Sequence, residues 1–90
     1  MSKSVVITDL DGTILPRGGR ISGAVLDAFQ RIGKSGNVRI IATGRNLYSA
    51  RQVLADDFPI DYLVFASGAG VMRWRDKKIL SAYHLSENDA

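Results

Sequence analysis

The chain has 90 residues, of which 46% are hydrophobic and 23% are charged, and its formal net charge is +3. This length fits one small domain, and no apolar run approaches the roughly 20 residues that a membrane-spanning helix needs. The absence of cysteine excludes disulfide bonds and thiolate metal sites. The 12 basic and 9 acidic residues favour an anionic ligand, and because they are not clustered we expect no binding to nucleic acid. The absence of cysteine and of long apolar runs fits a cytoplasmic protein that does not bind membranes.

The predicted elements begin with a strand over residues 4–8. Its β-branched run without alternation is typical of a strand that is buried on both faces in a parallel sheet. Ser22 fits the N-cap of a helix, because apolar residues then recur at helical spacing until Gly33 and Gly36. A second apolar run at 38–42 predicts the next strand and completes a strand-helix-strand unit.

The same order then repeats along the chain. A turn at 43–46 leads into a second amphipathic helix, and residues 62–66 form a third buried run. Right-handed crossovers between these strands predict a parallel three-stranded sheet with helices packed on it. Residues 71–74 and 78–82 then predict a β-hairpin.

Polar residues follow each of the three predicted parallel strands. Asp9 follows the first strand, Thr43 follows the second, and Ser67 and Gly68 follow the third. Ligands of such sheets bind beyond the carboxyl ends of the strands. We therefore expect the three turns to converge on one site.

Asp9 and Asp11 are the candidate catalytic pair at this site. Side chains two residues apart in an extended segment point the same way, so both carboxylates are expected to face the ligand. Two close carboxylates repel, which raises the pKa of one of them unless a cation lies between them. Mg²⁺ commonly uses one or two carboxylates plus a substrate phosphate. One carboxylate would then be a nucleophile that forms an aspartyl phosphate, and the other a general acid/base.

The neighbouring residues fit a phosphate ligand. Gly12 allows a sharp turn and a close approach of the backbone. Thr43, Gly44 and Arg45 lead into a helix N-terminus, where N–H groups and the helix dipole favour an anion. The alternative is an ordinary turn at 9–12, which the Asp-x-Asp-Gly composition also favours.

Two other ligand-binding motifs fit less well. A calcium loop with Gly12 as its sixth residue would put Ile7 at the first ligand position and Gly18 where a glutamate belongs. The glycines at 68–70 are similar to a dinucleotide fingerprint, but the third glycine is missing and a hairpin follows instead of a helix.

Two segments resemble motifs of the haloacid dehalogenase-like superfamily. ITDLDGTIL at 7–15 resembles the first motif, an apolar strand followed by Asp-x-Asp-Gly-Thr. IIATGR at 40–45 resembles the second motif as found in the Cof-type sugar-phosphatase branch. Residues 21–45 are similar to the first helix and second strand of the family, and residues 61–71 to its third strand and the segment entering the cap domain. The resemblance covers almost the whole chain.

This resemblance implies roles for individual residues. Asp9 would be the nucleophile and a Mg²⁺ ligand. Asp11 would be the general acid/base and would contribute its backbone carbonyl to the metal. Thr13 would stabilise the loop after the nucleophile. The residues that would bind the substrate or its phosphoryl group are Leu10, Gly12, Thr43, Gly44 and Arg45.

The implied fold is a Rossmann-like α/β core of three layers, of which the chain would form an incomplete part. Residues 1–82 would be the N-terminal half of the core domain, and residues 83–90 a linker-like tail toward an absent cap domain. The lysine and the acidic pair that complete the site of the family have no counterpart. Lys77 and Lys78 belong to the predicted hairpin and are poor substitutes.

The implied function is Mg²⁺-dependent phosphomonoester hydrolysis through an aspartyl phosphate. The substrate would be a small phosphorylated metabolite such as a sugar phosphate. The alternative is a non-catalytic fragment or assembly module that binds Mg²⁺ or phosphate weakly.

The first strand is central in the family and would here lie at an edge. Val5, Val6 and Ile7 would form an exposed apolar edge, which invites pairing with another chain. We therefore expect a homodimer or a larger assembly. Trp74 is expected to pack in the core or the hairpin.

Overall fold

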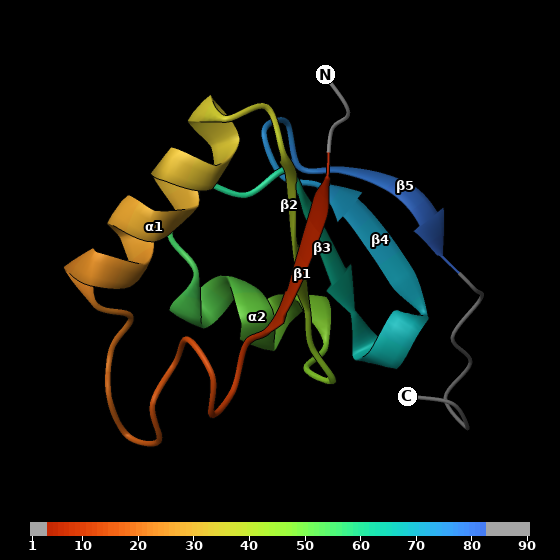
Figure 1. Ribbon diagram of the computed structural model, residues 1–90. Helices are drawn as coiled ribbons and strands as arrows, with labels where there is room; N and C mark the ends of the chain where they lie inside the picture. The colour runs from red at the N-terminus through yellow and green to blue at the C-terminus, as the bar shows by residue number, and fades with distance from the viewer. Residues whose placement is uncertain (1–3, 83–90) are drawn as a thin grey trace.

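The computed structural model describes residues 4–82, which form a mixed five-stranded sheet with two α-helices (Figure 1). Its elements are β1 (Val5–Asp9), α1 (Gly23–Lys34), β2 (Val38–Ala42), α2 (Leu47–Val53), β3 (Tyr62–Phe65), a turn at Ala66–Gly68, β4 (Gly70–Arg73) and β5 (Lys78–Ala82). The strands lie in the order β1-β2-β3-β4-β5; the first three are parallel, and β4 and β5 continue the sheet antiparallel. The predicted order of strands and helices and the hairpin are confirmed. The predicted tail at 83–90 lies outside the described residues.

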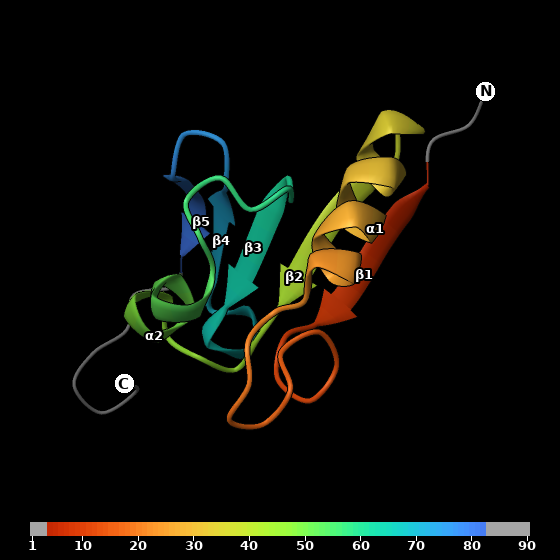
Figure 2. The same ribbon diagram turned by 90° about the vertical axis from the view of Figure 1, so that its left-hand side faces the viewer.

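Both helices cover the same face of the sheet (Figure 2). Phe29 of α1 and Ala50 of α2 share one hydrophobic core with Ile41 of β2 and Leu63 of β3. Two successive right-handed crossovers in the same direction across a sheet require this arrangement. Of the three expected layers, residues 4–82 therefore form the sheet and one helical layer.

The other face of the sheet carries apolar side chains that no helix of the described residues covers. Val5 pairs with Val38 and Ile7 with Ile40, so these four side chains lie on this face. Val5 is 58% exposed and Ile7 is 65% exposed, whereas Ile41 on the helical face is fully buried. As expected, β1 is an edge strand on which Val5 and Ile7 are exposed, whereas Val6 is half-buried. The burial on both faces that its composition predicted is wrong for residues 4–82, because no element of this part of the chain covers the face that carries Val5 and Ile7.

Arg39 of β2 connects α1 to the sheet through hydrogen bonds. Its guanidinium donates hydrogen bonds of 3.1 Å to both carboxylate oxygens of Asp61 and another of 3.1 Å to the Phe29 carbonyl. Gly33 leaves room for this group, because a Cβ there would lie 2.3 Å from Arg39 Nη1. The hydrogen bonds from Arg39 also lower the pKa of Asp61, against a smaller opposing effect of burial.

Trp74 packs in the core beside the β4–β5 turn and is only 1% exposed, which agrees with its expected place. Lys77 Nζ lies 4.0 Å from the centre of the Trp74 ring and donates hydrogen bonds to the carbonyls of Asp56 and Trp74. Because β4 is antiparallel to β3, this turn lies at the end of the sheet opposite the carboxyl ends of the parallel strands. No helix within residues 4–82 has the length and apolar character needed to cross a membrane.

Candidate active site

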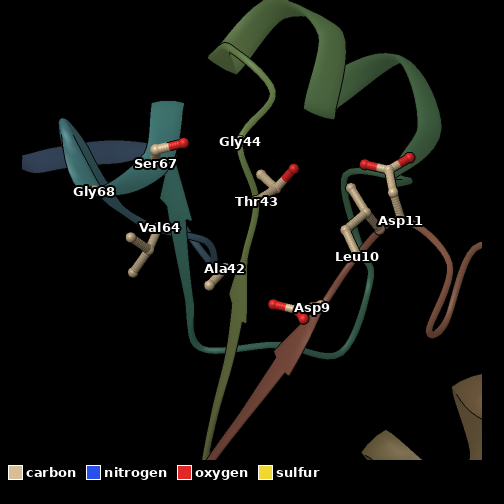
Figure 3. A pocket seen from close by; sticks show the side chains of 9 residues that line it. All are labelled: Asp9, Leu10, Asp11, Ala42, Thr43, Gly44, Val64, Ser67 and Gly68. Carbon is tan, nitrogen blue, oxygen red and sulfur yellow. The ribbon is translucent and has the colours of Figure 1, made fainter.

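A cleft of about 480 Å³ opens at the carboxyl ends of β1, β2 and β3 (Figure 3). It is lined by Asp9, Leu10, Asp11, Ala42, Thr43, Gly44, Val64, Ser67 and Gly68. The three polar turns predicted from the sequence therefore meet at one place. Gly12 and Arg45 do not line the cleft but belong to the loops that form it.

Asp9 is the last residue of β1, and its exposed carboxylate points into the cleft (Figure 3). The next side chain, Leu10, is fully buried in the core, so the backbone of Leu10 is the part that can face a ligand. Gly12 has a φ of 79°, a conformation that glycine adopts without strain, and its N–H donates to the Leu15 carbonyl at 2.9 Å. The chain thus turns sharply directly after the two aspartates.

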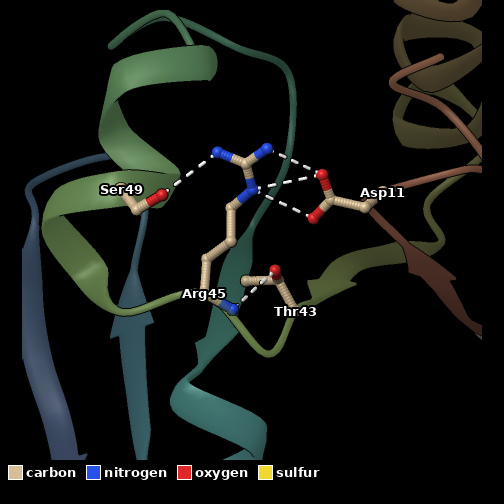
Figure 4. A network of polar contacts seen from close by, with 4 residues as sticks. All are labelled: Asp11, Thr43, Arg45 and Ser49. Carbon is tan, nitrogen blue, oxygen red and sulfur yellow. Dashed lines mark hydrogen bonds and ion pairs between the residues drawn. The ribbon is translucent and has the colours of Figure 1, made fainter. Parts of the chain in front are cut away.

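Asp11 is held by Arg45 in a bidentate ion pair (Figure 4). Arg45 Nε lies 2.9 Å from one carboxylate oxygen and Nη2 lies 2.7 Å from the other. The side-chain hydrogen bonds from Arg45 lower the pKa of Asp11, which outweighs a smaller rise from desolvation. The two aspartates do not face one site side by side as predicted, because β1 ends at Asp9, the two carboxylates point apart, and Arg45 pairs with Asp11.

Thr43 follows β2 and is 8% exposed. Its Oγ1 accepts a hydrogen bond of 3.0 Å from the Arg45 backbone N–H, which fixes the hydroxyl. A hydroxyl that accepts in this way still has its own hydrogen to donate to a ligand oxygen. Thr43 therefore has the chemistry expected of a residue that binds a phosphoryl group.

Arg45 is engaged with protein groups on both sides of its guanidinium. Nη1 donates to Ser49 Oγ at 3.1 Å, while Nε and Nη2 hold Asp11 (Figure 4). Asn46 caps α2 and accepts from the Ser49 N–H at 2.8 Å, so one N–H group of the expected anion site is already satisfied. The spacing of the sequence did not indicate the part played by Ser49, because it depends on the helical turn that places Ser49 beside Arg45.

The oxygen donors of the cleft fit a magnesium ion that is bound by few protein groups. The exposed Asp9 carboxylate lines the cleft, and Asp11 is also one of its lining residues. Residues 4–82 contain no cluster of three or more histidine, cysteine or acidic side chains that would hold a metal by themselves. Mg²⁺ keeps several waters and needs only one or two carboxylates, so this donor set suits it.

Ser67 and its neighbours form a left-handed turn at the rim of the cleft. Ala66, Ser67 and Gly68 have φ angles of 51°, 53° and 96°. Two hydrogen bonds hold the turn: the Ala66 N–H donates to the Arg45 carbonyl at 2.7 Å and the Ser67 N–H to the Thr43 carbonyl at 3.1 Å. The sequence placed Ser67 at the end of the third strand but did not single it out as a site residue.

Comparison with known proteins identifies relatives of this chain. A family model described as haloacid dehalogenase-like hydrolase matches residues 6–90. A protein named HMP-PP phosphatase from Yersinia enterocolitica is 35% identical over 63 residues, which are 70% of this chain and 23% of that protein. The chain thus spans about a quarter of the length of this curated relative.

Solved structures share the fold. A phosphatase of the haloalkanoate superfamily from Bacteroides thetaiotaomicron superposes with a TM-score of 0.77 at 28% identity, over 97% of this chain and 32% of that one. A structure described as a subclass IIB sugar phosphatase superposes with a TM-score of 0.66 at 24% identity, over 94% of this chain and 33% of that one. The chain corresponds to about a third of each of these structures.

Proposed function

Because the chain belongs to the haloacid dehalogenase-like hydrolase family, we propose that it carries the nucleophile and phosphate-binding part of a phosphatase active site. The reaction would be Mg²⁺-dependent hydrolysis of a phosphomonoester through an aspartyl phosphate. The observation that carries this proposal is the exposed Asp9 carboxylate in a cleft with the Thr43 hydroxyl. The phosphatase names of the relatives support it, and a small phosphorylated metabolite such as a sugar phosphate is the substrate class they favour.

The proposed chemistry has two steps. A carboxylate oxygen of Asp9 attacks the phosphorus atom, the ester P–O bond breaks, and Asp11 gives a proton to the departing alcohol oxygen. A water then gives a proton to Asp11 and attacks the phosphorus, which breaks the bond to Asp9 and releases inorganic phosphate. The Thr43 hydroxyl donates to a phosphoryl oxygen during both steps, with the Gly44 backbone beside it.

The Asp9 carboxylate and the Asp11 backbone carbonyl would hold the magnesium ion. When bound, the ion would supply positive charge that offsets the negative charge of the carboxylate and the phosphoryl group. Asp11 would serve the metal through its backbone alone, since its side chain has to carry the proton.

The second candidate function is a module without catalysis that binds Mg²⁺ or phosphate weakly. Two observations favour it. The Asp11 carboxylate is already paired with Arg45, and the hairpin lysines, Lys77 and Lys78, lie at the end of the sheet opposite the cleft. A phosphoryl group in this cleft would receive no lysine charge from residues 4–82, because none of the lining residues is a lysine.

Turnover of p-nitrophenyl phosphate separates the two functions. The native chain with Mg²⁺ should release nitrophenol, and Asp9→Asn should abolish the release because an amide is a far weaker nucleophile. Asp27→Asn is the matched control, since Asp27 is an exposed residue of α1 that pairs with Arg31. Equal rates in the native chain and Asp9→Asn would refute the nucleophile assignment, and phosphate binding without turnover would establish the non-catalytic module.

A further inference from the structure

We propose that Ser67 is an additional phosphoryl-binding residue, placed by the left-handed turn opposite Thr43. The proposal deepens the proposed function and rests on it. It concerns a residue that is outside the two sequence motifs at 7–15 and 40–45.

The first support is the position of the hydroxyl. Ser67 is exposed, lines the cleft with Asp9 and Thr43, and directs its hydroxyl oxygen toward Gly44 (Figure 3). A Cβ built on Gly44 would lie 3.3 Å from Ser67 Oγ, so the hydroxyl lies close over this glycine. A phosphoryl group bound at Thr43 and Gly44 would therefore have Ser67 on its other side.

The second support is the backbone conformation that produces this position. A left-handed conformation costs an L-residue roughly 1–2 kcal/mol, and Ala66 and Ser67 adopt it in succession with φ angles of 51° and 53°. Strain of this kind persists where the surrounding structure imposes it, and it is concentrated at functional sites. Here the turn is imposed by hydrogen bonds to the carbonyls of Thr43 and Arg45 in the β2–α2 loop, where we propose that the phosphoryl group binds.

These two hydrogen bonds fix the relative position of the two loops. The Ser67 N–H donates to the carbonyl of Thr43, whose hydroxyl is itself fixed by the Arg45 N–H. The backbone segments that carry the Thr43 and Ser67 side chains are thus joined at the ends of β2 and β3. Both residues line the same cleft, so each hydroxyl can donate to an anion bound there.

Binding of inorganic phosphate in the presence of Mg²⁺ tests the role of Ser67, with ¹H–¹⁵N NMR on the full chain as the readout. Ser67→Ala removes the hydroxyl and keeps the strained turn, whereas Ser67→Gly removes the hydroxyl and relieves the strain. Both should bind phosphate about tenfold more weakly than the native chain, since each loses one hydrogen bond to a charged group. Ser67→Asn should bind nearly as the native chain does, because asparagine tolerates this conformation and offers an N–H donor.

The control is Ser35→Ala, at the C-cap of α1 near the amino end of β2 and thus opposite the cleft, which should leave the affinity unchanged. Unshifted amide signals of Thr43 and Ala66 in the free variants would show that the turn is intact. Equal affinities of native chain and Ser67→Ala, with phosphate-induced shifts at Thr43 and Gly44, would overturn the Ser67 role alone. Shifts away from the cleft, or no phosphate binding by the native chain, would overturn the proposed phosphoryl site and the Ser67 role with it.

Discussion

Arg45 and Asp11 form a bidentate ion pair at the candidate site. Its Nε and Nη2 groups donate to both carboxylate oxygens, and these hydrogen bonds are the main cause of the lowered pKa of Asp11. A general acid has to carry a proton, so in the proposed reaction Asp11 has to leave Arg45 when the substrate binds.

Gly33 and Gly23 provide a matched pair of single-residue tests in α1. A Cβ at Gly33 would lie 2.3 Å from Arg39 Nη1, whereas a Cβ at Gly23 would meet nothing within 4 Å. Arg39 cannot simply move aside, because it is bonded to Asp61 and to the Phe29 carbonyl. Gly33→Ala should lower the free energy of unfolding by about 1–3 kcal/mol.

Gly23→Ala should leave the free energy of unfolding unchanged or raise it by up to about 1 kcal/mol, because alanine favours the helix. Urea denaturation followed by circular dichroism measures both variants. Equal stability of Gly33→Ala and Gly23→Ala would contradict the packing of Arg39 against Gly33.

Asp61 makes the stability of the chain depend on pH. Arg39 lowers its pKa in the folded state, so the folded state binds a proton less readily than the unfolded one. The resulting stabilisation is fully present above the unfolded pKa of about 3.9 and is lost as the pH falls through the lower folded value. Asp61→Asn should lower the free energy of unfolding by about 1–3 kcal/mol at neutral pH, as measured by urea denaturation. In this variant the free energy of unfolding should fall less steeply than in the native chain as the pH is lowered below about 4. The same dependence on acidic pH in both proteins would contradict this assignment.

At the scale of elements, Ser22 determines where α1 begins. Its Oγ accepts a hydrogen bond of 3.2 Å from the Val25 N–H, one of the unpaired donors of the first helical turn. Ser22→Ala should cost about 1 kcal/mol of unfolding free energy, and Ser22→Asp should retain the stability because aspartate caps equally well. Thermal unfolding of the two variants measures the effect, and matching transitions of native chain and Ser22→Ala would show that the cap is dispensable.

The order of the elements could be predicted because each follows from local pattern. The strand expected at 38–42 is β2 with the same bounds, and the strand expected at 62–66 is β3, which ends at Phe65. The last residue differs because Ala66 already has a positive φ and begins the turn. The common face of both helices follows from the crossover rule rather than from any residue.

The contacts that complete the site could not be predicted from local pattern. Asp11 and Arg45 are 34 positions apart, and their pairing depends on how the loops after β1 and β2 approach each other. The left-handed turn at Ser67 likewise depends on hydrogen bonds to carbonyls of the β2–α2 loop. The residues of the turn do not predict a left-handed conformation at Ala66 and Ser67, because they include no asparagine and their one glycine is Gly68. The residue types indicated the chemistry of the cleft, whereas the fold determined which residues pair with one another by hydrogen bonds and ion pairs.

At the scale of the whole molecule, the uncovered face and the edge of β1 expose apolar surface. Val5 and Ile7 lie on both, and an unpaired apolar edge favours pairing with another strand. We predict that the chain associates through β1 at micromolar concentration. Ile7→Lys should shift it toward monomer in sedimentation velocity experiments.

Ile79→Lys is the control for this prediction. Ile79 is also an isoleucine; it is 49% exposed and lies on β5, the other edge strand of the same sheet. This variant should associate as the native chain does. A native chain that sediments as a stable monomer, or equal effects of the two substitutions, would contradict association through β1.

The central claim is that Asp9 forms a covalent bond to phosphorus. Borohydride reduction of the chain during incubation with p-nitrophenyl phosphate and Mg²⁺, followed by peptide mass spectrometry, tests it most directly, since an aspartyl phosphate is reduced to homoserine. We predict homoserine at position 9 in the native chain, and none after Asp9→Asn or without Mg²⁺. An unmodified Asp9 in the native chain under these conditions would contradict the claim.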